Sequence, residues 1–294
     1  MLILAWAGKE RVLSDTLETF KADRLTSVEA GLFYLKPMAE KPYTVAYRTT
    51  ETGELPTNAV YEEHQVPIND ARPIAPALDL DREGVAFVTS PSIVRDFYDE
   101  AELDAVAHAE AAALVARVTG ASRVEVFDHT LRRRNSETPD RSAGVPRQPV
   151  MRVHNDYTEG SGPQRVRDLM GDEADRLLGK RYAFINVWRP LKGPVVDTPL
   201  AVCDARSVAP SDWVGCDMVY KDRTGEIYVT TYSPEHRWLY FPRMTPDEAI
   251  LIKCFDTRVD VARFAPHSAF TDPTTPEGAA PRESIEIRTV AFFE

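Results

Sequence analysis

The sequence predicts a mainly β fold with flanking helices (α+β), of the sandwich or jelly-roll type. Short β-prone runs follow one another along the C-terminal half, separated by Gly, Pro and Asp turns. They are 182–188, 200–203, 227–232, 238–241, 250–255 and 284–293. This spacing is typical of packed antiparallel sheets and not of a parallel βαβ sheet. Neither GxGxxG nor GxxxxGK[ST] occurs, which argues against a dinucleotide-binding or P-loop fold.

Two segments are predicted to be helices. Ser90 and Pro91 provide a cap and a first-turn proline for residues 91–119, which are rich in Ala, Leu and Glu. A second helix is expected over 163–180. Between them, a strand-like run leads into a Ser-, Pro- and Arg-rich segment that ends near Gln148. We expect that segment to be mobile or to act as a lid.

Composition limits the classes of partner and the compartment. The chain has 43% hydrophobic and 28% charged residues, which is typical of a globular protein. Its formal net charge of -11 argues against binding to a nucleic-acid backbone. The apolar start is broken at Gly8, and no run reaches membrane-spanning length. The three cysteines form no CxxC. We therefore expect a cytoplasmic protein without nucleic-acid or membrane partners.

Two histidine–acid pairs could contribute metal ligands. His108 and Glu110 lie in the first predicted helix, where positions two apart point about 200° away from each other. His154 and Asp156 follow a β-prone run, and on an extended chain such positions share one face. A second imidazole beside this pair would complete a facial triad, the ligand set of non-haem Fe(II) oxygenases, with open sites for cosubstrate and O₂.

The second histidine of such a triad has two downstream candidates, His236 and His267. His267 is favoured because it precedes Arg282 and Ser284, which open the last predicted strand with both side chains on one face. A guanidinium beside a hydroxyl suits a carboxylate. The same face continues to Arg288, so a solvated edge with weak salt bridges is the alternative interpretation.

Several blocks resemble a known enzyme family over residues 120–294. They are DHTLRR at 128–133, VHNDYT at 153–158, NVWRPL at 186–191, LAVCD at 200–204, KCFD at 253–256 and PRES at 281–284. Together they are similar to Fe(II)/2-oxoglutarate-dependent dioxygenases, in particular to the CmcJ/AsaB-like hydroxylases and desaturases of secondary metabolism. The first 120 residues match less specifically.

The resemblance implies a double-stranded β-helix in which His154, Asp156 and His267 bind Fe(II). It also implies that Arg282 and Ser284 bind 2-oxoglutarate, and that O₂ is the other cosubstrate. The interval from His267 to Arg282 is longer than in the plant-type pattern, so Arg288 is kept as a substitute anchor. Asn186 is expected near the cosubstrate.

Membership would make residues 1–294 one catalytic domain, with a core at 121–294 and a pocket shaped by 1–120 that includes the helix 91–119. The expected reaction is hydroxylation, desaturation or oxidative cyclisation of a small molecule in natural-product biosynthesis. A zinc hydrolase or isomerase and a non-catalytic binding barrel are the alternatives, and neither would need Arg282. The sequence does not identify the substrate. A homodimer is possible, but the sequence does not decide the oligomeric state. The arginines at 132–134 could bind an anionic substrate group or form a solvated face.

Overall fold

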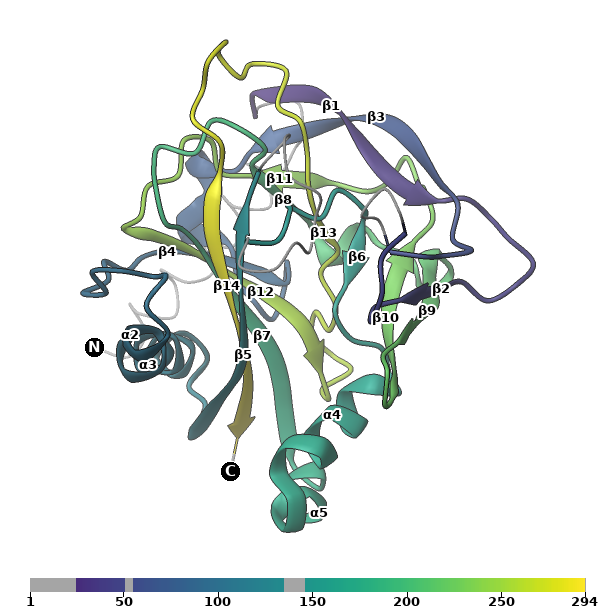
Figure 1. The fold of residues 1–294 in the computed structure, drawn as a ribbon, viewed down its shortest axis with the longest axis vertical. Helices are drawn as coiled ribbons and strands as arrows, with labels where there is room; N and C mark the ends of the chain where they lie inside the picture. The colour runs from purple at the N-terminus through teal and green to yellow at the C-terminus, as the bar shows by residue number, and fades with distance from the viewer. Residues whose placement is uncertain (1–24, 51–54, 135–145, 294) are drawn as a thin grey trace, which may run out of the picture.

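Two β-sheets face each other in the computed structural model, which describes residues 25–50, 55–134 and 146–293 (Figure 1). In hydrogen-bonded order, the larger sheet contains β1 (Ser27–Leu35), β3 (Tyr61–Asp70), β11 (Trp238–Tyr240), β8 (Leu200–Cys203), β13 (His267–Ala269), β6 (His154–Asn155), β10 (Thr224–Thr230), β9 (Trp213–Val219) and β2 (Tyr43–Val45). The smaller sheet contains β4 (Val85–Thr89), β12 (Glu248–Asp256), β7 (Arg181–Pro190), β14 (Glu283–Phe293) and β5 (Arg123–Arg133).

The chain winds between the two sheets from β5 onward. Strands β5, β7, β12 and β14 belong to the smaller sheet, and β6, β8, β11 and β13 to the larger one. This alternation is that of a double-stranded β-helix, so the predicted fold class is confirmed. The main apolar core lies between the sheets and joins Phe184 and Trp188 of β7 to Val202 of β8 and Leu239 of β11.

Strand alternation divides the smaller sheet into an inner and an outer face. Trp188 of β7 and Val290 of β14 point inward into the main core, whereas Ile185 and Ile287 point outward into a second apolar cluster. The outer cluster packs under α3 (His108–Thr119), which lies against the outer face of the smaller sheet. The inner face of β14 is therefore the face that carries Ser284, Glu286 and Arg288.

The first helix is shorter than predicted. Helical structure begins with α2 (Glu100–Glu102), passes through a π-helical turn (Leu103–Ala107) and continues as α3 to Thr119, so the expected start at Pro91 was wrong. Asp99 is the observed N-cap, since its side chain accepts from the Ala101 amide. Glutamates of the helix bind the amides of the preceding segment, as Glu110 binds that of Ile93.

The second predicted helix is divided into α4 (Ser161–Met170), a 3₁₀ turn (Gly171–Glu173) and α5 (Ala174–Leu178). The break falls at Gly171, whose φ of 51° lies in the left-handed region that favours glycine. Further 3₁₀ turns cover Arg72–Ala77, Ala205–Ser207 and Pro210–Asp212. Among the described residues, no helix combines the length and apolar character that a membrane span requires.

The predicted strands of the C-terminal half all occur, and β8 matches its predicted run in full. Three long strands were missed, namely β1, β3 and β9. Strands β3 and β9 carry polar or charged residues between their apolar ones, and much of the stability of such strands comes from pairing within the sheet. Strand β1 ends in the apolar run 32–35, which the sequence prediction overlooked. The predicted mobile segment or lid falls mainly on 135–145, outside the described residues.

A buried ionic cluster ties β12 to β7 at one end of the smaller sheet. The Asp256 carboxylate is fully buried and accepts from Arg181 Nη2 at 2.7 Å and from Lys253 Nζ at 2.9 Å. Lys253 is itself only 1% exposed. Both cations also bind the partly exposed Asp81. Since the buried Lys253 has no water to replace the Asp256 carboxylate, removal of that carboxylate is expected to destabilise the cluster.

We predict that Asp256→Ala lowers the free energy of unfolding by about 3–5 kcal/mol, the usual effect of removing one member of a buried ion pair. Urea denaturation monitored by circular dichroism measures this change. Asp260→Ala, which removes the exposed partner of Arg258, is the control and should leave the denaturation midpoint unchanged. Equal midpoints for the two variants would contradict the proposed contribution of the cluster.

Candidate metal and cosubstrate site

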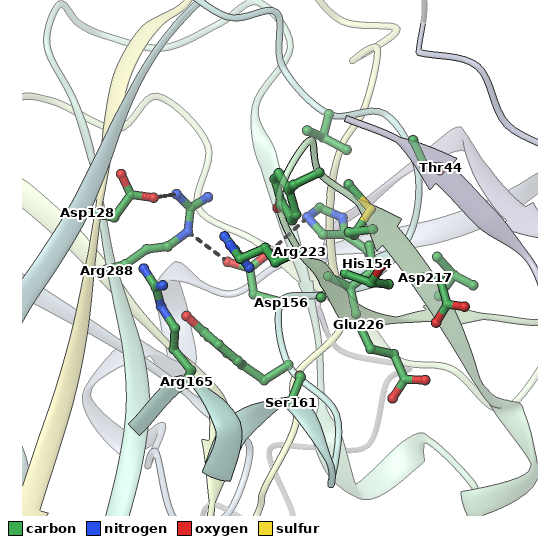
Figure 2. Close-up of a pocket in the computed structure, with 18 of the residues that line it drawn as sticks. Thr44, Asp128, His154, Asp156, Ser161, Arg165, Asp217, Arg223, Glu226 and Arg288 are labelled. Carbon is green, nitrogen blue, oxygen red and sulfur yellow. Dashed lines mark hydrogen bonds and ion pairs between the residues drawn. The ribbon is translucent and has the colours of Figure 1, made fainter. Parts of the chain in front are cut away.

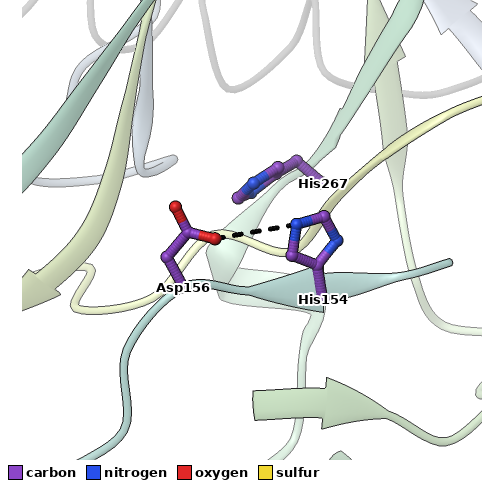
Figure 3. A group of neighbouring side chains, drawn as sticks. All are labelled: His154, Asp156 and His267. Atoms are coloured by element: carbon purple, nitrogen blue, oxygen red, sulfur yellow. Dashed lines mark ion pairs between the residues drawn. The ribbon is translucent and has the colours of Figure 1, made fainter. Parts of the chain in front are cut away.

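Three side chains converge where β6 and β13 pair. His154 begins β6, Asp156 follows two residues later, and His267 begins β13 directly opposite His154 in the antiparallel register. Their potential ligand atoms all lie within 4.8 Å of one another (Figure 3). Residues from two distant parts of the chain therefore present two imidazoles and one carboxylate to a single point.

The backbone selects the tautomer of both histidines. His154 Nδ1 lies 2.8 Å from the carbonyl oxygen of Arg152, and His267 Nδ1 lies 3.1 Å from that of Ala265. A carbonyl can only accept, so each Nδ1 carries the proton and each Nε2 keeps a lone pair. His267 Nε2 is buried and has no hydrogen-bond partner among the described residues. Burial, followed by the nearby His267, lowers the pKa of His154 to about 3, so that this ring is neutral.

Asp156 is held through one of its two oxygens. Asn186 Nδ2 donates to Oδ2 at 2.8 Å, and Arg288 Nε donates to the same atom at 3.1 Å. Oδ1 is left on the side of His154, 3.7 Å from its Nε2. Burial alone would raise the pKa of Asp156, but Arg288 and the two histidines hold it well below its ordinary value. The group is therefore an ionised carboxylate with one free oxygen.

Two neutral imidazole lone pairs and one carboxylate oxygen fit a divalent transition metal such as Fe(II). The buried Nε2 of His267 supports the same fit, since among the described residues it has no hydrogen-bond donor and its lone pair is left for a metal.

Arg282 lies deep between the sheets, just before β14. It is 3% exposed, and its Nε donates to Ser284 Oγ at 3.2 Å, so the two side chains share a face as the sequence predicts. One further nitrogen donates to the carbonyl of Thr198, and the guanidinium carbon lies 5.3 Å from the Trp188 ring centroid. Within the described part of the chain Arg282 forms no side-chain ion pair. Burial lowers its pKa to about 9, which still leaves it cationic at neutral pH.

The alternative anchor, Arg288, is surrounded by acceptors. It pairs with Asp156, with Asp128 at 2.8 Å and with Glu286, and it also donates to Thr130. Asn186 likewise binds Asp156 directly. Both residues therefore contact a candidate metal ligand, a relation that the strand pattern alone could not reveal. The interpretation of 282–288 as a solvated edge was wrong, because the Arg282, Ser284 and Glu286 side chains are buried.

A pocket of about 1320 Å³ opens onto this site (Figure 2). His154, Asp156 and Arg288 line it, with β9 and β10 on one side and Ser161 and Arg165 of α4 on the other. The residues that line it do not include His267, Asn186, Arg282 or Ser284. The N-terminal third also contributes to the wall, through Thr44, Leu55, Thr57 and Tyr61.

His236, the other candidate for the second imidazole, lies elsewhere. Its Nδ1 is 3.1 Å from the Tyr34 hydroxyl and its Nε2 is 3.1 Å from Asp212. Both ring nitrogens are therefore engaged outside the triad. His108, from the rejected pair, contacts His129 at 3.1 Å between α3 and β5.

Comparison with known proteins gives a consistent result. A family described as "Oxidoreductase/YMDC permease-like domain" matches residues 32–292. The chain is 34% identical to the Fe(II)/2-oxoglutarate-dependent dioxygenase nvfI of Aspergillus novofumigatus, over 91% of this chain and 97% of that protein. It is 37% identical to the hydroxylase/desaturase efuI of Hormonema carpetanum, over 81% and 86% of the two chains.

A solved structure agrees with these sequence matches. The iron and alpha-ketoglutarate-dependent endoperoxidase NvfI superimposes with a TM-score of 0.81 at 33% identity, over 91% of this chain and 98% of that one. Since relatives at this level of identity match nearly end to end in both sequence and fold, the protein belongs to the family of Fe(II)/2-oxoglutarate-dependent dioxygenases and acts as a small-molecule hydroxylase, desaturase or oxidative cyclase of secondary metabolism.

Proposed function

We propose that His154, Asp156 and His267 bind Fe(II) and that Arg282, assisted by Ser284, binds the far carboxylate of 2-oxoglutarate. The observation that carries the metal assignment is the pair of Nε2 lone pairs, set by carbonyl contacts and aimed beside one free carboxylate oxygen. The observation that carries the cosubstrate assignment is a buried guanidinium that forms no ion pair among the described residues.

Arg282 is preferred to Arg288 on grounds of charge. Three carboxylates already surround Arg288, so a further anion there would be repelled. Among the described residues, the acceptors of the Arg282 side chain are a hydroxyl and a carbonyl, and Trp188 covers one side. The buried Trp188 Nε1, a donor, likewise has no hydrogen-bond partner in the described part of the chain. A bound carboxylate in this space would accept hydrogen bonds from the guanidinium and from such a donor.

Fe(II) with 2-oxoglutarate and O₂ supplies the oxidation of an unactivated C–H bond, with 2-oxoglutarate converted to succinate and CO₂. The chain's own residues hold and orient the reactants. Asn186 and Arg288 both donate to Asp156 Oδ2, so Oδ1 is the oxygen that would bind the metal. The sheets around Arg282 exclude water from the carboxylate pair. The pocket places the small-molecule substrate beside His154 and Asp156.

The family assignment decides against a zinc hydrolase and against a non-catalytic barrel. The structure also bears on the first alternative, because a hydrolase needs no buried guanidinium behind its metal site. A cosubstrate-dependent oxidation requires both the three metal ligands and a carboxylate-binding pair such as Arg282 and Ser284.

We further propose that residues 1–294 act as one catalytic domain, with a core at 121–294 and a pocket shaped by 1–120. The contribution of Thr44 and Tyr61 to the pocket wall supports this division. The cytoplasm is the proposed compartment, in keeping with the free, buried cysteines Cys203, Cys216 and Cys254. Binding to nucleic acid is not expected at a net charge of -11. A homodimer stays a prediction that sedimentation velocity would decide.

We predict a visible absorption band at about 500 nm when Fe(II) and 2-oxoglutarate are added without oxygen. A keto acid chelated to iron with open sites gives a metal-to-ligand charge-transfer transition of this kind. His154→Ala should abolish the band. His64→Ala, which removes a histidine of β3 outside the triad, should retain it. Wild-type protein that holds iron and shows no band would contradict the proposal.

Arg282→Gln should weaken 2-oxoglutarate binding by about tenfold or more, because the ligand loses a charge-assisted pair in a buried site. Titration of the band against 2-oxoglutarate measures this. Arg258→Gln, which changes an exposed arginine paired with Asp260, is the control and should bind as wild type does. Unchanged affinity in Arg282→Gln would assign the anchor elsewhere.

Asn186→Ala should lower the affinity for Mn(II), a surrogate for Fe(II), by about 10- to 100-fold. The substitution removes a hydrogen-bond donor to Asp156 Oδ2, and this carboxylate is then less well oriented toward the metal. Electron paramagnetic resonance of free Mn(II) measures binding. Gln164→Ala, a change on the pocket wall that touches only Asp168 in the contacts observed, serves as the matched control. Equal affinities would show that Asn186 does not orient Asp156.

A further inference from the structure

Two arginines stand side by side on the pocket wall. Arg132, near the end of β5, forms a parallel bridge with Arg147, whose amide donates to the carbonyl of Leu131 at 3.0 Å. Paired residues of a bridge project to the same face, about 5 Å apart at Cβ. Both side chains line the pocket that His154 and Asp156 also line. Two positive charges are therefore held together above the metal site.

The protein provides little to offset this charge at Arg147. Its Nη1 is buried and has no hydrogen-bond partner among the described residues. Like charges placed directly opposite each other destabilise a sheet, and a buried guanidinium nitrogen without an acceptor adds to that cost. The arrangement would be stabilised by an anion that accepts from Arg147.

The acidic residues of the pocket wall have other partners. Asp128 pairs with Arg288, and Asp217 and Glu226 both bind Lys41. Asp168 accepts from Gln164 at 2.8 Å. Among the described residues that line the pocket, no carboxylate pairs with Arg147, and we expect an anion to come from a ligand.

The neighbouring arginines show that this arrangement is specific. Arg133 points to the opposite face, is about half exposed and lies 3.6 Å from Glu283. Arg134 pairs with Asp197. The two interpretations of 132–134 therefore apply to different residues: Arg132 faces the pocket, whereas Arg133 has the exposure expected of a solvated face.

The other side chains of the pocket wall indicate the kind of molecule that would carry the anionic group. Apolar and aromatic side chains line the same pocket, namely Leu55, Phe127, Tyr157, Met218, Ile227 and Val229. The pocket volume of about 1320 Å³ far exceeds that of 2-oxoglutarate alone. An amphiphilic molecule would fit such a wall.

We propose that Arg132 and Arg147 bind a carboxylate of the oxidised substrate, and that the substrate is an amphiphilic carboxylic acid whose apolar body lies along Phe127 and Met218. This inference rests on the proposed metal site, since it places the substrate in the pocket that opens onto His154. The carboxylate ion pair would fix one end of the substrate and so select which carbon faces the metal.

A carboxylate could come from the substrate or from 2-oxoglutarate, because Arg132 lies beside Ser284 in the β5–β14 register. The two sources are separated by saturating the cosubstrate site first. The protein is loaded with Mn(II) and excess 2-oxoglutarate, and octanoate is then titrated by isothermal calorimetry. Octanamide, which has the same chain without the charge, is the matched ligand.

The expected result is that octanoate binds in the presence of 2-oxoglutarate and that octanamide binds about tenfold more weakly or less. Arg147→Gln and Arg132→Gln should each weaken octanoate binding by about tenfold, because each removes a charge-assisted hydrogen bond. Arg133→Gln, the neighbouring arginine on the other face, should bind octanoate as wild type does. Arg147→Lys keeps a charge and should retain more affinity than Arg147→Gln, which excludes misfolding as the cause.

Three results would overturn the inference. One is equal affinity of wild type for octanoate and octanamide, or no binding of octanoate. Another is undiminished octanoate binding in Arg147→Gln. The third is displacement of octanoate by 2-oxoglutarate, which would assign the arginines to the cosubstrate. The absorption band of the iron form, recorded on wild type, tests the metal site by itself, so its failure is distinguishable from failure of the carboxylate site.

Discussion

The pairing of β13 with β6 is the constraint on which the site depends. Strand β13 has three residues, and its first, His267, lies directly opposite His154. A shift of one residue in that register would turn the His267 side chain to the other face of the sheet and remove it from the triad. Pairing of β13 with β8 on its other side, from His267↔Val202 to Ala269↔Leu200, holds the short strand in place.

The two buried arginines at the start of β14 and within it, Arg282 and Arg288, differ in how far neighbouring carboxylates balance their charge. Arg288 is balanced by Asp156, Asp128 and Glu286, so this part of the barrel is complete without a ligand. In the described part of the chain, the Arg282 side chain donates to a hydroxyl and a carbonyl and to no carboxylate. Burial of an uncompensated charge is unfavourable, so binding of an anion at Arg282 would stabilise the folded protein.

Much of the site could be predicted from sequence because its ligands follow local rules. An HxD pair on an extended run shares a face, as does Arg-x-Ser at the entry to a strand, and both relations occur in the structure. The start of the first helix could not be predicted from Ser90-Pro91, because Asp99 forms the cap and glutamates from the helix bind the segment before it. Strands β3 and β9 lack a long apolar run, so their formation depends on the strands they pair with.

The partners of Asn186, Arg147 and Arg288 depend on contacts between residues far apart in the sequence. Asn186 and Arg288 meet Asp156 only because β7 and β14 pair in a register that places them opposite each other. Arg147 acquires its place beside Arg132 through a single bridge that no local pattern signals. The contacts of such side chains can be assigned only when the sheet register is known.

The most direct test of the central claim is an anaerobic crystal structure of the iron-loaded protein with 2-oxoglutarate, with iron located by anomalous scattering. We expect one iron bound by His154 Nε2, His267 Nε2 and Asp156 Oδ1, with the far carboxylate of 2-oxoglutarate on Arg282 and Ser284. Iron at any other position, or a 2-oxoglutarate carboxylate held by Arg288 in place of Arg282, would contradict it.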